Sequence, residues 1–569
     1  MKHIFTTLLL MGATATATAQ DISQIAKSDP LLISGSVGTR NTYYHSTGGS
    51  GYASPLSNSV YANLNISLFG FSMPFSLYYT NDNLAFNYPH LSFNMSPSYK
   101  NWRAHIGRSS MNYSPYVLTM SFNGVGLEYT GSKLRTGAFY GTLRSAVNDD
   151  PNMPNARRPQ YKRLGWGFNV GYGSERNYAD LYLLRAYDRP NSLDQRWHNV
   201  VNPQENLVVG FRGGLAIQSW LSFTANLAAS AFSQDINAPL VENAQAQRYE
   251  DLFNVRYSSM MRFAGDANLN FTLPQVNLSL FYRMVQPDYT SLGAYYMTNN
   301  YHSLGVNASG TLFNTLSLSA TFSGQSDNLS KRQLYTTSGY VYALNASRRF
   351  GNHFNLSAGY NGYLQDQRDG TAHVNDTSRV HRIMHSLNVV PAVFFNSELM
   401  QHNISLSANW VKNKDLNILS TGVGDVQTLA LGLNYDINIE PWDTDFNLSL
   451  SHQQSKSEAS TYTSDIASVG VNRSFLKDRN LNISLTGTLC YNEVTMQSKS
   501  LSIGFDASIG YTLKKMHVFS LSAGVNKYGD VNPSRTRSGL DATDISASLN
   551  YAYTFSILEL KRKSNEKKL

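Results

Sequence analysis

The chain has 569 residues, a net charge of +8 and only 15% charged residues, a profile that argues against a nucleic-acid partner. Its single cysteine, Cys490, excludes an internal disulfide and a cysteine-based metal site. The mean hydropathy is −0.31, and no long apolar run follows the first residues, which excludes a helical membrane protein.

The chain starts with MKHIFTTLLLMGATATATAQ, which has the three parts of an export signal. Lys2 supplies the positive charge, a short apolar run follows, and Ala17-Thr18-Ala19 forms a cleavage site. The apolar run is shorter than the ~20 residues that a membrane anchor needs. We predict a signal peptide over residues 1–19 and a short periplasmic segment over 20–30.

Residues 31–115 are the part of the chain whose structure is hardest to predict. The stretch GSVGTRNTYYHSTGGSGYASP is rich in glycine and serine and resembles a loop. Pro74 and Pro89 fit poorly inside paired strands because proline lacks the backbone N–H donor. Two interpretations stay open: this region forms the first strands of a sheet, or part of it folds into a lumen.

Alternation of apolar and polar residues dominates the chain from there on. In NLNISLTGTLCYN (480–492), Leu481, Ile483, Leu485, Leu489 and Tyr491 share one face, and small polar residues fill the other. Similar stretches recur at 403–410, 446–450, 500–511 and 519–525. Such strict alternation predicts half-buried strands.

The polar faces and the strand lengths decide what the apolar faces contact. The polar faces carry Ser, Thr, Asn and Gly, whereas the exposed face of a soluble sandwich would carry Lys and Glu. The segments run about 10–15 residues, enough for a tilted spanning strand. Because an open sheet edge is not tolerated in lipid, the sheet must close. We predict a transmembrane antiparallel β-barrel over 31–557, with its apolar face in lipid.

The connections alternate between short and long from about residue 257 onward, as in outer-membrane barrels. The predicted tight turns are 273–274, 313–314, 350–352, 441–443, 477–479 and 514–515. The predicted longer loops are 287–300, 327–333, 366–379, 413–425, 455–463 and 529–541. Both termini then lie in the periplasm, with an even number of about 22–26 strands. Residues 558–569 form a basic periplasmic tail.

Several residues are candidates for particular roles. Aromatic side chains at the two ends of the barrel would form girdles at the membrane interfaces, and the candidates are Tyr295, Tyr296, Tyr340, Tyr342 and Trp442. The loop after residue 365 offers oxygen and imidazole groups that could bind a cation, and these weak candidates are Asp366, Asp369, His373 and Asp376. No metal spacing motif accompanies them, so we expect no metal, no cofactor and no catalytic site.

The stretch 104–147, with 161–174 after it, resembles outer-membrane barrels of the Bacteroidota that have no assigned activity. The residues that carry the resemblance are His105, Gly107, Ser114-Pro115-Tyr116, Gly124, Gly126, Glu128, Arg135, Tyr140 and Gly141. The resemblance implies location and architecture only. Glu128 and Arg135 fall on neighbouring predicted strands, and we expect them to form an ion pair in the lumen.

Two functions follow from a barrel of this kind. The first is a porin-like channel that passes small polar solutes through a lumen lined by Ser, Thr, Asn and Gly. The second is an accessory barrel in an outer-membrane complex for protein assembly, secretion or surface display. The expected partners are outer-membrane lipid and lipopolysaccharide, with other envelope proteins in the second case.

Overall fold

The structure is a computed structural model, and it describes residues 31–48, 55–81, 91–149, 157–242, 252–375, 377, 379–417, 419, 424–476, 478–495, 497–531 and 541–560. The predicted signal peptide, the segment 20–30, residues 561–569 of the basic tail, Pro89 and Asp376 lie outside these residues. Within them, no helix is long and apolar enough to span a membrane.

The regular secondary structure of the described chain consists of strands and three short 3-10 helices, Pro190–Ser192, Gln195–Trp197 and Glu440–Trp442. The first half contains β1 (Leu31–Ser46), β2 (Leu56–Leu68), β3 (Phe71–Thr80), β4 (Leu91–Met95), β5 (Ser98–Tyr99), β6 (Trp102–Ser109), β7 (Phe122–Thr130), β8 (Leu134–Arg144), β9 (Arg163–Gly173), β10 (Tyr178–Asp188), β11 (Glu205–Gln218), β12 (Leu221–Ser233), β13 (Ser259–Thr272) and β14 (Val276–Val285). The second half contains β15 (Tyr301–Leu312), β16 (Leu316–Asp327), β17 (Tyr335–Phe350), β18 (Phe354–Asp369), β19 (His381–Asn396), β20 (Met400–Asp415), β21 (Val426–Ile439), β22 (Thr444–Ser457), β23 (Thr461–Phe475), β24 (Leu481–Val494), β25 (Ser498–Leu513), β26 (His517–Asp530) and β27 (Ala542–Leu560).

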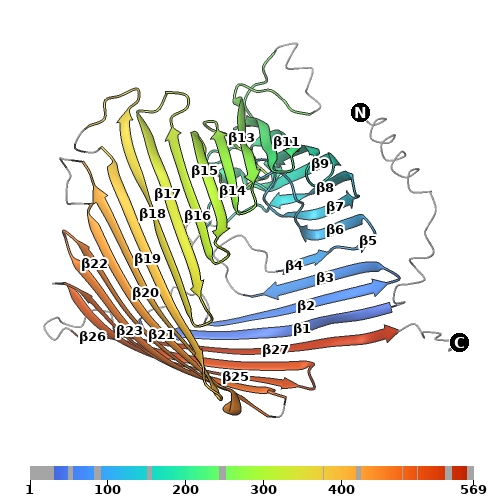
Figure 1. Ribbon diagram of the computed structural model, residues 1–569. Helices are drawn as coiled ribbons and strands as arrows, with labels where there is room; N and C mark the ends of the chain where they lie inside the picture. The colour runs from blue at the N-terminus through green and yellow to red at the C-terminus, as the bar shows by residue number, and fades with distance from the viewer. Residues whose placement is uncertain are drawn as a thin grey trace.

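The strands form one closed antiparallel sheet (Figure 1). Apart from the short strands β4 and β5, each strand pairs with the next along the chain, and the last strand, β27, pairs with β1 from Leu31↔Leu560 to Ser46↔Asp544. Closure leaves no unpaired sheet edge, as a lipid environment requires. The predicted transmembrane-type antiparallel barrel is therefore confirmed.

The short strands β4 and β5 occupy a single position in the barrel between β3 and β6. The 27 strands of the described chain therefore fill 26 positions, an even number at the upper limit of the predicted range. The interruption lies at Ser96 and Pro97, opposite Pro74 of β3, whose carbonyl accepts a hydrogen bond from the Ser96 N–H at 3.0 Å. Residues 31–109 thus supply the first strands, and proline is accommodated where the neighbouring strand is broken.

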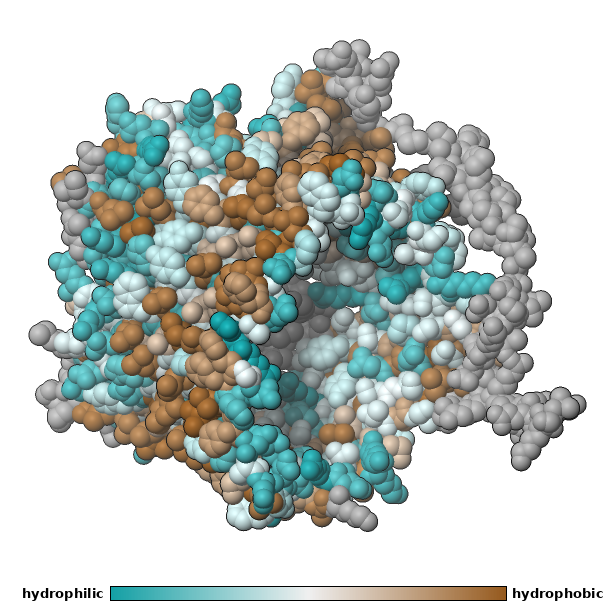
Figure 2. All heavy atoms as spheres, viewed as in Figure 1, coloured by the Kyte–Doolittle hydropathy of each residue, from teal (hydrophilic) through white to brown (hydrophobic). Residues whose placement is uncertain are grey.

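Because apolar and polar residues alternate along the strands, the two faces of the sheet differ in chemistry. In β24, Leu485 and Leu489 are 43% and 47% exposed, and they lie in register with Ala507 and Ile503 of β25 on the outer face. Ser484, Thr486 and Thr488 lie on the opposite, inner face. Figure 2 shows large hydrophobic areas on the visible wall of the barrel. An apolar area of this extent must be covered, and a barrel exterior is covered by hydrocarbon.

Most connections alternate in length, which defines a short-turn end and a long-loop end of the barrel; the exceptions at the long-loop end are the short connections between β22 and β23 and between β24 and β25. The predicted tight turns all lie at the short-turn end, together with Leu31 and Leu560. One loop prediction was wrong: 455–463 is mostly strand, since β22 runs to Ser457 and β23 starts at Thr461, with Lys456 paired to Thr461. These strand ends are polar on both faces, so their sequence looks like a loop although the backbone remains paired.

Candidate functional site: a partly filled lumen

The inner faces of β15–β27 carry mainly serine, threonine, asparagine and glycine. A representative cross-strand row joins Ser449, Ser468 and Thr488, with a 3.3 Å hydrogen bond between the last two hydroxyls. In β26 and β27, Ser522 and Ser548 are hydrogen-bonded at 2.8 Å. Short hydroxyl and amide side chains that bond to one another along the wall leave the space in front of them free for water. Figure 2 shows a hollow between the strands on the left and those on the right.

Two long connections fold inward and fill the lumen beside β7–β14. They are residues 110–121, between β6 and β7, and residues 286–300, between β14 and β15. Together with inward side chains of the wall they form the buried apolar cluster of the described chain. Its members are Met111, Tyr113, Tyr116, Val117, Leu118, Phe122, Phe139, Leu143, Tyr182, Leu184, Ala186, Val208, Ala228, Phe232, Ala264, Val285, Tyr289 and Leu292. We call the two connections the lumenal segments. A partly lumenal course was one of the two interpretations of residues 31–115, and of the lumenal segments only residues 110–115 fall within that range.

The lumenal segments are joined directly by hydrogen bonds. The Tyr289 hydroxyl donates to the Tyr116 carbonyl at 2.7 Å, and the Ser291 hydroxyl donates to the Val117 carbonyl at 2.6 Å. The backbone N–H groups of Thr119 and Met120 donate to the Gly293 carbonyl at 3.1 and 3.0 Å. These bonds satisfy backbone carbonyls that would otherwise be buried without partners, so the two segments form one folded unit.

Polar side chains of the barrel wall hold this unit in place. The Tyr116 hydroxyl donates to the Asp266 carboxylate of β13 at 2.7 Å, and the Ser114 hydroxyl donates to the Asn226 side chain of β12 at 2.7 Å. Asn206 of β11 is fully buried, and its carbonyl oxygen accepts the Leu292 N–H at 2.9 Å. The attachment therefore extends over three neighbouring strands of one wall.

Glycine on the inner wall makes room for the segments. A Cβ atom on Gly210 of β11 would lie 2.5 Å from Cγ2 of Val117, and one on Gly137 of β8 would lie 2.7 Å from Cε of Met111. Both distances are shorter than real Cβ contacts allow. Glycine at these two strand positions permits close packing against a second layer of chain.

Burial keeps the tyrosines of the lumenal segments uncharged. Desolvation raises the pKa of the Tyr113 hydroxyl far above its usual value, and it does the same for Tyr289. For Tyr116, desolvation is again the main cause of a raised pKa, and the hydrogen bond to Asp266 adds to it. The apolar cluster and its hydroxyl groups thus keep one protonation state across the physiological pH range.

Most charged residues on the inner wall of β6–β11 are paired, but Glu128 and Arg135 do not pair with each other as the sequence predicts. Glu128 bonds to His105 at 2.7 Å, and Arg135 bonds to Asp180 at 2.8 Å, so the expected pair of Glu128 and Arg135 is replaced by two others. Gly171 lies between Arg135 and Asp180 in the cross-strand row. Because Gly171 has no side chain, the guanidinium can cross it to reach Asp180, which also pairs with Arg212 at 2.8 Å.

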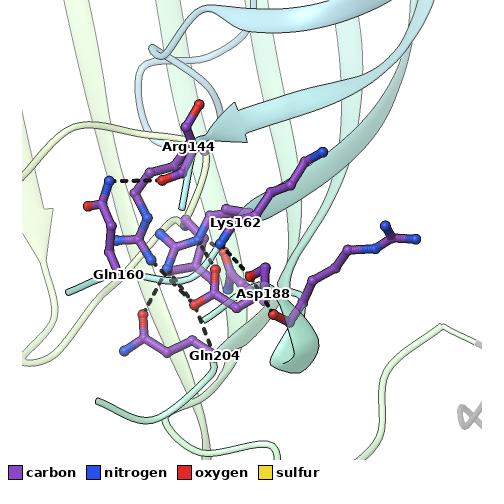
Figure 3. A network of polar contacts seen from close by, with 12 residues as sticks. Arg144, Gln160, Lys162, Asp188 and Gln204 are labelled. Atoms are coloured by element: carbon purple, nitrogen blue, oxygen red, sulfur yellow. Dashed lines mark hydrogen bonds and ion pairs between the residues drawn. The ribbon is translucent and has the colours of Figure 1, made fainter. Parts of the chain in front are cut away.

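A second polar network lies at the long-loop end of the same wall (Figure 3). Asp188, which is 1% exposed, accepts bonds from Arg163 at 2.8 and 3.0 Å and from the Gln204 N–H at 3.2 Å. Arg144 adds a longer contact of 3.4 Å to the same carboxylate. The network links β8, β9 and β10 to the connection before β11, so it holds the strand ends around the mouth of the barrel.

The opposite wall has a different charge pattern. The inner faces of β20–β27 carry several carboxylates, among them Asp436, Asp445, Asp506 and Asp544. Within the described chain none of these four is in an ion pair. The described inner faces of the same eight strands carry no lysine or arginine. The free part of the lumen is therefore bordered by uncompensated negative charge.

The predicted girdle residues fall into different places. Tyr340 and Tyr342 lie on the outer face of β17, and Trp442 lies in a turn at the short-turn end, 58% exposed. Tyr295 and Tyr296 belong to a lumenal segment and not to an outer strand end, which corrects that expectation. The inward fold of this connection is not visible in its composition.

Sequence reasoning missed two outer-face aromatic clusters at the short-turn end. In one, Phe395, His402 and Tyr435 stack across β19–β21, with ring centroids 4.4 and 6.1 Å apart. In the other, His517 lies 4.7 Å from the ring of Tyr553 and bonds to the Tyr551 hydroxyl at 2.9 Å. The sequence feature that could have predicted these clusters is an aromatic or histidine residue on the apolar face of an alternating strand, next to a tight turn.

The candidate metal residues are occupied by other interactions. Asp366 bonds to Arg368 at 2.9 Å and to Arg379 at 2.7 Å, and Asp369 bonds to His373 at 2.7 Å. The backbone N–H of Val374 and the His373 side chain lower the pKa of Asp369. The described residues contain no group of three or more potential ligands.

No protein-family model and no curated protein sequence matches the chain. Solved structures similar to it include OccK8 (OprE) of Pseudomonas aeruginosa, at 10% identity over 70% of this chain and 98% of that one, with a TM-score of 0.31. BauA, the ferric preacinetobactin receptor of Acinetobacter baumannii, is similar at 9% identity over 92% of this chain and 80% of that one, with a TM-score of 0.38. The P pilus usher PapC pore is similar at 12% identity over 92% and 100%, with a TM-score of 0.26.

Proposed function

We propose that this protein is a channel of the bacterial outer membrane that passes small polar solutes. The observation that carries the proposal is the division of the lumen into two parts. The lumenal segments and their apolar cluster fill the space beside β7–β14. By contrast, the side chains on the inner faces of β15–β27 are short and polar, and among the described residues no folded segment fills the lumen in front of them. Solutes would pass along this second wall.

The outer-membrane location follows from the exterior of the barrel. Its outer face is apolar along closed strands of about the length that a bilayer requires. In such barrels the short turns face the periplasm and the longer loops face outward. The chain would therefore have both termini in the periplasm, and the predicted export signal would deliver it there.

The charge of the free wall gives the channel a preference for cations. Asp436 and Asp506 lie on the inner faces of β21 and β25 without a basic partner, whereas Arg135 and Arg212 of the opposite wall are both paired with the Asp180 carboxylate. A lumen bordered by carboxylates raises the local concentration of positive ions. The small hydroxyl and amide groups of this wall can form hydrogen bonds with polar solutes of different shapes.

Planar-bilayer recording tests the proposal. Purified protein, inserted into a bilayer with symmetric KCl, should give reproducible unitary current steps. A heat-denatured sample from the same preparation is the control for detergent artefacts. Insertion of folded barrel, verified by its shifted mobility in unheated gels, without current steps at any voltage would refute the channel function.

The firmly bonded lumenal segments favour a second candidate, a scaffold barrel in an outer-membrane complex. A barrel whose lumen is partly filled by its own chain can serve as a rigid support without conducting. Purification from native membranes in mild detergent, followed by mass spectrometry, distinguishes the two. Stoichiometric envelope proteins together with a silent bilayer recording would support the scaffold.

A further inference from the structure

A groove of about 750 Å³ crosses the outer face of the barrel from β19 to β24, and we call it the outer groove. Two cross-strand rows of mostly apolar side chains line it. The row nearer the long-loop end begins Val389, Ala408 and Leu431, and the next row contains Leu406, Leu433, Leu450, Ala467 and Leu489. Its volume lies within the range of about 300–1,000 Å³ that small-ligand sites occupy.

Small residues in register with larger ones make the surface concave. Ala408 lies between Val389 and Leu431 in its row. Ala467 lies between Leu450 and Leu489 in the row below. A methyl group between branched side chains leaves a channel over the backbone, and the channel runs across the strands among leucine side chains. Its lining suits a hydrocarbon chain.

An ionisable pair closes the groove on one side. His452 of β22 and Asp465 of β23 are bonded at 2.7 Å, and their side chains are 43% and 49% exposed. They continue the row of Val389, Ala408 and Leu431 and therefore face outward. An ionisable pair on the lipid face of a barrel is costly, and its presence there indicates a specific polar contact.

Positive charge lies beyond this pair, towards the long-loop end. Lys412 of β20 and Lys456 of β22 occupy the outer face in one row, with Gln427 between them. Two strand spacings separate the lysines, roughly 10 Å between backbones. Neither lysine forms an ion pair within the described residues, whereas nearby Lys499 is paired with Glu493 at 3.0 Å. An anionic group placed above the groove would meet two free ammonium groups and His452.

We propose that the outer groove binds lipid A, the phosphorylated and multiply acylated anchor of lipopolysaccharide, with one acyl chain in the groove and a phosphate at Lys412 and Lys456. The apolar lining of the groove matches the acyl chains of lipid A. The lysines, which lie nearer the long-loop end, match its phosphates. The choice of leaflet rests on the proposed function, which places the long-loop end, and so this half of the barrel, in the outer leaflet. Phosphate on a lysine pair forms charge-assisted hydrogen bonds.

Native mass spectrometry of the delipidated, detergent-solubilised barrel tests the proposal. Lipid A, phosphatidylglycerol and phosphatidylcholine are each titrated against the wild type. We expect one lipid A to bind, with at least fivefold weaker binding of both phospholipids. Ala408→Trp fills the groove and should weaken lipid A binding at least fivefold. The double variant Lys412→Glu with Lys456→Glu should do the same.

Matched controls occupy the same outer face away from the groove. They are Ala320→Trp on β16 and Lys527→Glu on β26, and both should bind lipid A as the wild type does. Wild-type affinity in Ala408→Trp, or an equal loss in Ala320→Trp, would overturn the groove as the site. Phosphatidylglycerol binding as tightly as lipid A would overturn the choice of lipid. A dimer that Ala408→Trp dissociates would assign the groove to a second copy of the chain.

Failure of this inference is separable from failure of the channel function. The groove lies outside the lumen, so Ala408→Trp should retain wild-type unitary conductance whatever its lipid affinity. Heat-modifiable gel mobility establishes that each variant is folded. A silent wild-type barrel that still binds lipid A at the groove would refute the channel and leave the lipid site standing.

Discussion

The hydroxyl of Tyr116 donates a 2.7 Å hydrogen bond to the carboxylate of Asp266, a residue 150 positions later in the chain. Tyr116 lies in a connection between strands, and Asp266 lies on the inner wall of the barrel. The bond fixes the end of a lumenal segment against the wall, and Asp266 also accepts from Asn268 at 3.1 Å. A substitution at this contact is the most direct way to test how the lumenal segments fill the lumen.

Loss of that bond should loosen the lumenal segment. Tyr116→Phe removes only the hydroxyl, and a hydrogen bond to a charged group contributes about 1.5–3 kcal/mol. We expect additional open substates of higher conductance in single-channel recordings, with the barrel still folded. Tyr551→Phe, which removes a hydroxyl from the outer face, is the control and should conduct as the wild type does. Identical traces for Tyr116→Phe and the wild type would argue against a segment held by this contact.

A larger side chain at Gly210 should expel the segment altogether. The Cβ of Gly210→Val would lie 2.5 Å from Val117, which is fully buried and has no room to move. Displacement of the lumenal segment should raise unitary conductance at least twofold and expose residues 110–121 to added protease. Gly487→Val is the matched control, because nothing lies within 4 Å of its Cβ position. The prediction fails if both variants conduct equally.

Neutralisation of the free wall should reduce cation preference. In a KCl gradient, the wild type should show a reversal potential of the sign that K⁺ selectivity produces. Asp436→Asn combined with Asp506→Asn removes two carboxylates from the inner faces of this wall, and we expect the reversal potential to move towards zero. Asp369→Asn, at the end of β18 beside a loop, should leave it nearly unchanged. Anion selectivity in the wild type would contradict the proposed charge pattern.

One loop contact should titrate in acid. The Arg157 side chain holds the pKa of Asp149 at about 2, below the ordinary value of 3.8. Because the folded pKa is depressed, the contact stabilises the loop fully above the ordinary value and is lost as the pH falls towards 2. The Arg157 N–H, which donates to Asp149, should show amide exchange protection that is constant down to about pH 4 and declines below. Asp149→Asn should lack this pH-dependent change.

The sequence alone determined the strands, their two faces and the alternation of short and long connections. These features depend on neighbours: a side chain on a strand faces opposite to the next one, so Leu485 and Thr486 reveal the two faces without any knowledge of the rest of the chain. The strand number must then be even if both ends of the barrel chain lie at the short-turn end. Of the broken position at Ser96 and Pro97, the sequence showed only Pro74, the proline opposite it, which fits poorly inside a paired strand.

Only the tertiary structure decided what fills the lumen and which charges meet. The connections 110–121 and 286–300 bond to one another across more than 160 residues, and no local pattern gives the direction in which a connection folds. Arg135 pairs with Asp180 because Gly171 leaves space between them, a consequence of the register of three strands. The outer groove likewise exists only where small residues of separate strands come side by side, since concavity is a property of packed neighbours and not of a sequence.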